Sequence, residues 1–580
     1  MSTAPRLLPL LLVPSLTALC LAACGSDGAA TGDDTRATGD ADAPDAPDAP
    51  DATGAEDSAT PVDSATAPDG TDVAAPEVDV PNPQADAYQA VWSERLRTDP
   101  ATDGHVLGLR YIAGQGGGGT TTPSTALALL EVSGTASLSG GDGAESALPG
   151  EGHRLIVATL APDTGAVVSS AVVALPAGAS VARVGKAGAG FAATVHEAAG
   201  DHVVVGQAIG TDVRVTTLAL AGGSVRMPSQ GDLRFATSSG VTTAMAVELA
   251  CDAAATLAVS SGESTLSFDV PAGGGIAFVQ LAAPSADAAL PSEGTAVVVV
   301  PGLAPSDAAE TRSGPVVAAS VGVATTLGTT ALVAGEKALV IGALDEQGAL
   351  AAFALWHAAA DGGSVDVIQL AGGQGGGLVL AGRGEGDLHF GPDELTSATP
   401  RDFIAALGSA GSLLYEAPEC DRILAVSVSN QYRILKVSCD VDGDGPGLVL
   451  TSLTTDFGGN LQDPIDQLLL ELPTATAPAV LAGIVSFTVT DGRASGALVD
   501  FGRGPRLVLV RGDGQAYDSG VPPALVRSGP STDPLFFTTL RFGGGGGATN
   551  PNTNAVLFAV PAADGTVIGR ARIVLLTIIQ

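Results

Sequence analysis

The chain has 580 residues, of which 62 are Asp or Glu and 26 are Lys or Arg, so its formal net charge at pH 7 is −36. Nucleic-acid binding needs clustered Lys and Arg to neutralise phosphates, so this balance argues against a nucleic-acid partner. It equally disfavours adsorption to anionic lipid by charge alone.

Residues 1–23 are predicted to be an export signal. One basic residue, Arg6, precedes an apolar run that begins at Leu7 and is shorter than the roughly 20 apolar residues a membrane-spanning helix needs. The run ends in Leu21-Ala22-Ala23-Cys24, which resembles the lipobox of bacterial lipoproteins. An ordinary secretory signal followed by an incidental cysteine is the alternative.

The lipoprotein resemblance implies that the thiol of Cys24 is lipidated, with palmitate-type acyl chains, and becomes the mature N-terminus. Because one acyl chain binds a membrane only reversibly, stable anchoring implies more than one chain. Gly25 and Ser26 follow Cys24, where many inner-membrane lipoproteins of Gram-negative bacteria have an aspartate. By this analogy the protein is anchored in the outer membrane of the cell envelope, and its exposure to the periplasm or to the outside stays open.

Residues 24–85 are predicted to be a disordered tether. The segment is rich in Asp, Ala and Pro, includes three consecutive Asp-Ala-Pro units from Asp42 to Pro50, and has one cation, Arg36. It has too little apolar surface to offset the entropy of ordering, while its prolines and like charges favour extended conformations. As a random coil it spans roughly 45 Å.

Residues 86–580 are predicted to be an all-β body. They contain many apolar runs of four to seven residues bounded by Gly, Asp, Ser, Thr or Pro, which is typical of strands and tight turns. Long stretches of strong helix formers are missing from this part of the sequence, and so are uncharged apolar segments of about 18 residues.

A repeat is visible in the C-terminal half. Each copy has an apolar strand, a strand ending in Phe-Gly, and a second apolar strand followed by a Gly turn; the Phe-Gly pairs are Phe390-Gly391, Phe457-Gly458, Phe501-Gly502 and Phe542-Gly543. Weaker echoes lie at Leu155–Leu160 and Leu339–Leu344. Self-similarity at tens of residues points to a propeller, a solenoid or an array.

The repeat resembles the β-propeller repeats of bacterial exported lipoproteins, clearly over 378–570 and faintly over 86–377. The resemblance implies a β-propeller-like body of about seven or eight irregular blades, and it implies no activity, because propellers host enzymes, binders and scaffolds alike. The apolar run Ile573–Ile579 would be an aggregation-prone edge unless it is paired. We expect it to pair with the strand around Trp92 and close a ring.

The sharpest local motif is the acidic stretch at residues 440–445. Asp440, Asp442 and Asp444, followed by Gly445, alternate as the carboxylates of calcium loops do. The EF-hand pattern is incomplete, since Thr451 stands where that loop has Glu. The sequence therefore predicts a calcium site, with an acidic hairpin turn as the alternative.

Cysteines and histidines give further expectations. Cys420 and Cys439 flank the hairpin Ile423–Val437, so a disulfide between them would brace the acidic loop, leaving Cys251 as a buried free thiol. His196 and His202 flank the turn at Gly200-Asp201. They lack metal-site spacing, so surface or core roles are expected for them.

These observations favour a non-enzymatic envelope lipoprotein whose body is an interaction or adhesion module for a protein or glycan partner. The glycine runs lack the Lys-Ser/Thr of phosphate loops, and the sequence has no Gly-x-Ser-x-Gly elbow. The alternative is a hydrolase or lyase acting on extracellular polysaccharide, with carboxylates from several blades converging on the central channel. Carboxylates with Arg or His at one mouth of a ring would favour the enzyme, whereas a channel lined by Ala, Val and Gly would oppose it.

Overall fold

The computed structural model describes residues 88–573 with internal gaps, the longest of which are 282–294, 455–465, 471–479, 519–535 and 540–554. The chain divides into Met1–Asp79 and Val80–Gln580, and the described residues all belong to the second unit. Their regular structure is β-strand throughout, which confirms the all-β prediction. Among them there is accordingly no helix with the length and apolarity of a membrane span. The predicted export signal and tether lie outside the described residues.

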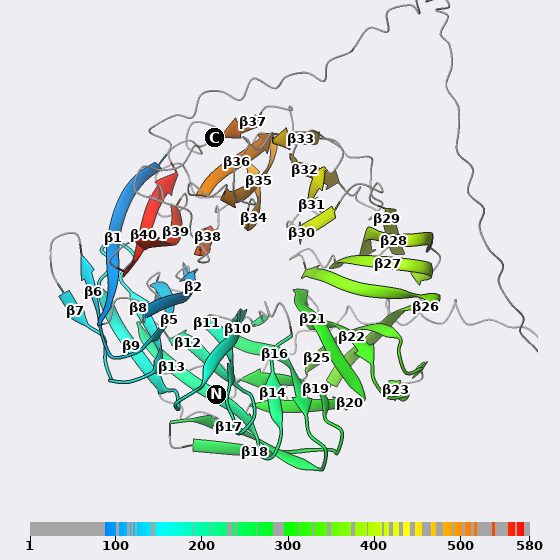
Figure 1. Ribbon diagram of the computed structural model, residues 1–580, viewed down its shortest axis with the longest axis horizontal. Helices are drawn as coiled ribbons and strands as arrows, with labels where there is room; N and C mark the ends of the chain where they lie inside the picture. The colour runs from blue at the N-terminus through cyan, green and yellow to red at the C-terminus, as the bar shows by residue number, and fades with distance from the viewer. Residues whose placement is uncertain are drawn as a thin grey trace, which may run out of the picture. The chain divides into compact units, whose positions relative to one another are not determined.

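The strands form antiparallel sheets, three of which occupy the first half of the body (Figure 1). The β2 sheet contains β2 (Gly104–Ile112), β5 (Thr125–Val132), β8 (Arg154–Leu160) and β9 (Val167–Ala174). The β10 sheet contains β10 (Ser180–Ala187), β11 (Gly190–His196), β12 (His202–Ile209), β13 (Asp212–Leu220), β17 (Ala255–Ser261) and β18 (Ser264–Val270). The β14 sheet contains β14 (Ser224–Arg226), β16 (Gly240–Ala250), β19 (Gly275–Leu281) and β20 (Ala296–Pro301), with β15 (Phe235–Thr237) also paired to β16.

The second half contains one long sheet and two of four strands. The long sheet runs through β21 (Leu303–Thr311), β22 (Gly314–Val321), β25 (Lys337–Leu344), β26 (Leu350–Gly372), β27 (Leu378–Phe390), β28 (Asp393–Gly408) and β29 (Gly411–Glu416). The next contains β30 (Arg422–Val428), β31 (Arg433–Asp440), β32 (Gly447–Thr454) and β33 (Asp466–Leu470). The last contains β34 (Val480–Val489), β35 (Gly492–Asp500), β36 (Pro505–Arg511) and β37 (Ala516–Asp518).

Strands from the two ends of the body share one sheet, the terminal sheet. Its order is β38 (Phe536–Thr539), β39 (Ala555–Ala562), β40 (Gly565–Ile573), β1 (Tyr88–Asp99), β6 (Thr135–Gly140) and β7 (Glu145–Ala147). Small separate ribbons pair β3 (Gly116–Gly117) with β4 (Thr120–Thr121) and β23 (Thr325–Leu327) with β24 (Thr330–Leu332).

The expected pairing of the strand around Trp92 with the chain's C-terminal end is only partly matched. Trp92 on β1 lies opposite Arg570 on β40, and β1 and β40 run side by side (Figure 1). Of the apolar run Ile573–Ile579, only Ile573 belongs to β40, and the rest lies outside the described residues. The tight β39–β40 hairpin at Gly565, whose φ is 130°, sets this register by fixing where β40 begins.

A β-bulge lies in the first strand of five sheets, those that begin with β2, β10, β21, β30 and β34, and again within β26; the described pairs of the β14 sheet have none. Register shifts lie between Val106/Gly108 in β2, Val181/Arg183 in β10, Pro305/Asp307 in β21, Val367/Gln369 in β26, Ile423/Ala425 in β30 and Leu481/Gly483 in β34. A bulge adds one residue and bends its strand, so a shared bulge position marks a shared structural unit. The unit therefore extends over both halves of the body, including the half in which the sequence repeat is faint.

Neighbouring sheets pack face to face, and β8 shows how. Its side chains are all buried and alternate between two cores: Ile156 joins Trp92 and Leu96 of the terminal sheet, whereas Leu155 joins Phe191 of the β10 sheet. Side chains of a strand point alternately to its two faces, so a continuous apolar run buries both. This explains why the sequence shows uninterrupted apolar runs rather than alternation.

Candidate functional site

Two buried carboxylates accept hydrogen bonds from backbone groups of other strands. Asp307 on β21 is fully buried; its Oδ1 accepts from the backbone N of Ala308 at 2.8 Å and its Oδ2 from the N of Leu370 at 2.6 Å. Asp402 on β28 accepts from the N of Ile423 on β30 at 2.7 Å. Buried carboxylates need such donors to offset their desolvation. These two groups therefore tie one strand group to the next.

Buried arginines do the same with backbone carbonyls. Arg110 on β2 donates from Nη1 to the O of Gly190 in the β10 sheet at 2.9 Å. Arg570 on β40 donates from Nη1 to the O of Pro162, in the β8–β9 turn, at 2.5 Å, and Trp92 Nε1 donates to the same oxygen at 2.8 Å. One carbonyl thus joins the terminal sheet to the β2 sheet.

The exposed charged group with the most defined geometry lies at the turn between β11 and β12, and we call it the Asp201 cluster: His196, Asp201 and Arg226. His196 ends β11 and Arg226 ends β14. Nδ1 of His196 lies 2.5 Å from Oδ1 of Asp201, and Nε of Arg226 donates to Oδ2. Asp201 is 6% exposed, whereas the side chains of His196 and Arg226 are 62% and 49% exposed. A buried carboxylate therefore orients two exposed polar groups.

The backbone around Asp201 fixes this geometry. The N–H of Asp201 donates to Oγ of Ser224, and its carbonyl accepts from the N of Val225 at 2.8 Å. Gly200 has a φ of 123°, and a Cβ there would lie 2.3 Å from the O of Gly223. Glycine is required at this position because only it combines positive φ with such a close approach of β14.

Electrostatics keep Asp201 ionised. Burial raises the pKa of its carboxyl, but hydrogen bonds from Arg226 and His196, together with their charges, outweigh burial and leave the pKa below its usual value. The hydrogen bond that Arg226 donates to Asp201 raises the pKa of Arg226. With Asp201 a carboxylate, Nδ1 of His196 donates to it and Nε2 is presented outward.

An aspartate–histidine pair supplies two of the three groups of a hydrolytic triad, which also needs a nucleophile within hydrogen-bond reach of the imidazole. Asp201 is the hydrogen-bond partner of His196. In the described part of the chain, no group of three or more His, Cys, Asp or Glu is placed to hold a metal. The outward imidazole and guanidinium groups can hydrogen-bond a partner.

Sequence reasoning found part of this cluster. It located His196 and His202 on either side of the turn, and they do flank it; Nδ1 of His202 lies 3.5 Å from Oε1 of Glu197. It missed the roles of Asp201 and Arg226. Arg226 is 25 residues away in sequence, and only the packing of β14 against the turn brings it to Asp201.

The residues of the predicted calcium loop are only partly described. Asp440 is the last residue of β31 and lies opposite Gly447, so a hairpin spans the predicted loop. Asp442 and Asp444 lie outside the described residues. The predicted calcium site therefore stays a prediction.

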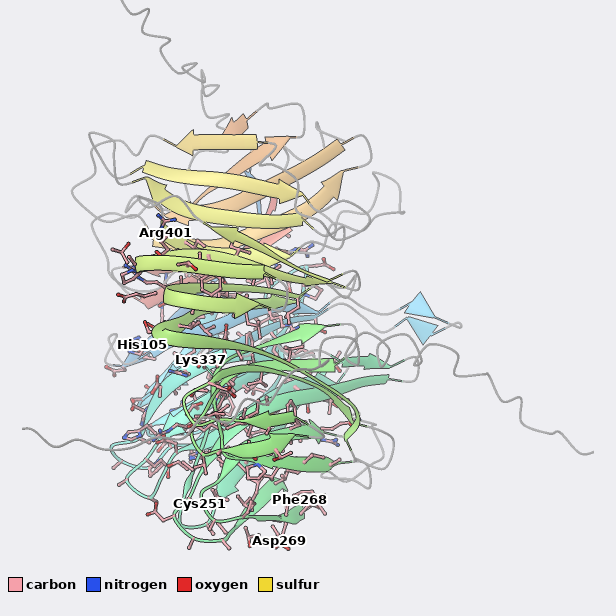
Figure 2. The ribbon with its side chains drawn as sticks, turned by 90° about the vertical axis from the view of Figure 1, so that its right-hand side faces the viewer. His105, Cys251, Phe268, Asp269, Lys337 and Arg401 are labelled. Atoms are coloured by element: carbon pink, nitrogen blue, oxygen red, sulfur yellow. The ribbon has the colours of Figure 1, made fainter. Side chains whose placement is uncertain are left out.

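The predicted cysteine sites are also only partly described. Cys24 and Cys420 lie outside the described residues, while Cys439 on β31 lies opposite Arg422. Cys251 is a free thiol, as expected, but it is partly buried rather than buried. It follows the end of β16 directly and donates to the O of Pro271 at 3.4 Å; its position is labelled in Figure 2.

Comparison with known proteins adds no assignment: no protein-family model matches the chain, and no curated protein sequence is significantly similar to it.

Proposed function

We propose that this chain is a lipid-anchored protein of the cell envelope whose β-propeller-like body binds a protein or glycan partner and catalyses no reaction. The anchor rests on the lipobox-like residues Leu21–Cys24 and on the acidic tether of residues 24–85, which would hold the body away from the membrane. The proposal of partner binding depends on the architecture of the body, residues 86–580.

A propeller of eight blades is consistent with the strand groups. The first part of β26 pairs with β25 and its second part, Ala359–Gly372, pairs with β27, so β26 can serve two blades. With β26 counted twice, eight groups of four can be chosen from the described strands, the last made of β38, β39, β40 and β1. The strands outside these groups are β3, β4, β6, β7, β15, β17, β18, β23 and β24. Completion of the last blade by an N-terminal strand is the kind of pairing that protects sheet edges in closed arrays.

The non-enzymatic proposal depends on one observation: the buried charged side chains form hydrogen bonds with backbone groups. Asp307 and Asp402 accept backbone N–H donors, and Arg110 and Arg570 donate to backbone carbonyls. A polysaccharide hydrolase needs a pair of carboxylates open to substrate. Charged groups that hold neighbouring sheets together support a rigid scaffold, and the Asp201 cluster supports recognition at its surface.

The anchor is tested by replacing the lipidated residue. Wild-type chain should incorporate labelled palmitate and sediment with the outer membrane, and Cys24→Ser should abolish the label and shift the protein to the soluble fraction. An unlabelled wild-type chain, or one found wholly in the inner membrane, would contradict the proposed anchoring.

The binding function is tested on intact cells. Crosslinking followed by capture of the chain should recover a protein or glycan partner, and a deletion strain should lose adhesion. Unaltered adhesion together with no recovered partner argues against an interaction module. Release of new sugar ends from a polysaccharide by the purified chain would instead favour the hydrolase or lyase.

A further inference from the structure

The β2 sheet is shorter than the sheets on either side of it. The terminal sheet continues past β1 with β6 and β7, and the β10 sheet continues past β13 with β17 and β18, whereas the β2 sheet stops at β9. Both longer sheets share a core with the β2 sheet, so both are its direct neighbours. With strands spaced about 4.8 Å apart, the β2 sheet ends roughly 10 Å short of them.

The last strand of the β2 sheet is an apolar edge strand in the described part of the chain. β9 reads Val-Val-Ser-Ser-Ala-Val-Val-Ala, without charge or proline, and its strand partner in the described part of the chain is β8 alone. Val168 and Val172 are 49% and 38% exposed, while Val167 packs against the core shared with the terminal sheet and Val173 against the core shared with the β10 sheet. A long, uncharged, apolar edge is a template for an added strand.

The neighbouring sheets end differently. β7 is three residues long and includes Glu145, and β18 alternates Phe268, which packs on the core, with Asp269, which is exposed (Figure 2). Short length and outward charges are two of the devices that prevent strand addition, and a β-bulge is another. β9 lacks the first two; its register shift opposite Thr159 and Leu160 makes Val168 an extra residue near the start of the strand and leaves Ser169–Ala174 in regular pairing with β8.

Carboxylates surround the β9 edge. Asp163, in the turn before β9, is 79% exposed. Glu151 is exposed and follows Gly150, where a Cβ would lie 3.5 Å from Cγ1 of Val172. Asp212 is exposed and directly follows Thr211. The hydroxyl of Thr159 donates to the O of Thr211 at 2.7 Å and also bonds the O of Ser169 in β9, which places Asp212 near this strand. The edge is therefore apolar along its length and acidic around it.

We propose that β9 is a docking edge for an extended segment of a partner protein, about eight residues long, with apolar side chains at alternate positions and Lys or Arg at its ends. The segment adds a fifth strand to the β2 sheet: its backbone bonds β9, its apolar side chains cover Val168 and Val172, and its cations meet Asp163, Glu151 and Asp212. A second copy of this chain is disfavoured as occupant because it would bring the same carboxylates and a further net charge of −36. This inference rests on the proposed binding function and names its kind of partner.

The test measures binding of a synthetic peptide to the full chain in detergent. The probe is fluorescein-labelled Lys-Lys-Val-Thr-Val-Thr-Val-Lys-Lys, and the control peptide has Glu in place of each Lys. We expect anisotropy to show binding of the first peptide, at least tenfold weaker binding of the second, and new hydrogen-exchange protection of β9 amides in the first complex alone.

Matched variants separate the edge from general charge. The double substitution Val168→Lys and Val172→Lys should weaken the Lys-peptide at least tenfold, because it places cations on the edge. Thr265→Lys with Ser267→Lys makes the same charge change at exposed positions on β18 and should change affinity less than twofold. Equal loss in both variants, or no binding by the wild-type chain, overturns the proposal.

Two other occupants give distinct outcomes. A wild-type dimer in sedimentation that Val168→Lys with Val172→Lys converts to monomer would show a second copy on the edge and overturn the proposal. Peptide binding gained only when the chain is shortened after Ile573 would show that the chain's own C-terminal segment occupies β9, and would overturn it too. If the peptide fails to bind while cells still depend on the chain for adhesion, this edge is wrong and the broader proposed function stands.

Discussion

Arg154, the first residue of β8 in the β2 sheet, and Arg226, in the Asp201 cluster, use the same functional group in opposite ways. Arg154 is 1% exposed; its Nε donates to the O of Pro149 at 2.9 Å and its Nη1 to the O of Gly134 and of Gly152, each at 2.7 Å. Arg226 is half exposed and bonds a carboxylate. The first arginine fixes the path of the backbone, and the second presents a charged group to solvent.

Their pKa values shift in opposite directions for this reason. Burial lowers the pKa of Arg154, and the charge of Glu151 opposes the shift only in part. The hydrogen bond that Arg226 donates to Asp201 raises the pKa of Arg226 despite some burial. Burial of the Arg154 guanidinium therefore carries a desolvation cost, which its hydrogen bonds to backbone carbonyls offset. In the Asp201 cluster, the opposite charges of Asp201 and Arg226 stabilise each other. The comparison predicts large stability losses in the first region and small ones in the second.

The largest effect is expected from Arg154→Ala. It removes three charge-assisted hydrogen bonds and leaves three carbonyls to find other donors, so the free energy of unfolding should fall by about 4 kcal/mol. Urea denaturation of the full chain measures it, with exposed Arg97→Ala as the control. Arg154→Lys keeps the charge but not the planar fork, and should recover less than half of the loss. A loss under about 1 kcal/mol for Arg154→Ala would remove the distinction between the two regions.

The next effect concerns the shared carbonyl of Pro162. Arg570→Ala should cost about 3 kcal/mol and Trp92→Phe about 1 kcal/mol, since the first removes a buried charged donor and the second a neutral one. The double variant should lose more than the sum, because either donor alone still satisfies the oxygen and only the double variant leaves it without one of them. Urea denaturation of the four chains completes the cycle. Strict additivity would mean that the two donors do not share their acceptor in solution.

Much of the fold could be predicted because strand signals are local. The apolar runs bounded by Gly and Asp predicted strands, and several are strands, such as 155–160 within β8 and 339–344 within β25. The repeat unit was harder to see. Its shared feature is a bulge in the first strand, and the residues at it vary from Leu107 to Ser306 and Ile368. A bulge is a property of backbone pairing, so it leaves no fixed residue type in the sequence.

The Asp201 cluster could not have been predicted in full. His196 and Asp201 are five residues apart and mark a turn, but Arg226 reaches them through the pairing of β14 with β16, which the sequence does not encode locally. Cys251 was predicted to be a buried free thiol; it is free, but it is only partly buried. Free cysteines are usually buried in the protein core, but Cys251 lies directly after the end of β16, where its side chain is only partly covered.

A smaller effect is expected from Asp201→Asn. The amide keeps the shape of the side chain but loses its charge, so the free energy of unfolding should fall by about 1 kcal/mol at pH 7, since both partners are half exposed. The folded pKa of Asp201 lies below its unfolded value, which is about 3.9. Its contribution is therefore complete above about pH 5 and is lost as pH falls through the lowered folded pKa. Urea denaturation across pH 3–7 should show the wild type and the variant converging at the acidic end, and a difference that grows on acidification would contradict the assignment.

The smallest stability effect is expected from Arg226→Ala. This variant distinguishes a structural role of the Asp201 cluster from a role in partner recognition. Because the guanidinium is half exposed and its ion pair is screened by water, the loss should be about 0.5 kcal/mol, close to that of the control Arg97→Ala. If the cluster contributes to recognition, crosslinking on intact cells should recover at least threefold less partner with Arg226→Ala than with Arg97→Ala, at equal amounts of folded chain. A stability loss above about 2 kcal/mol would place Arg226 with Arg154 as a structural group. Unchanged partner recovery would remove the cluster from the binding surface and leave β9 as the better candidate.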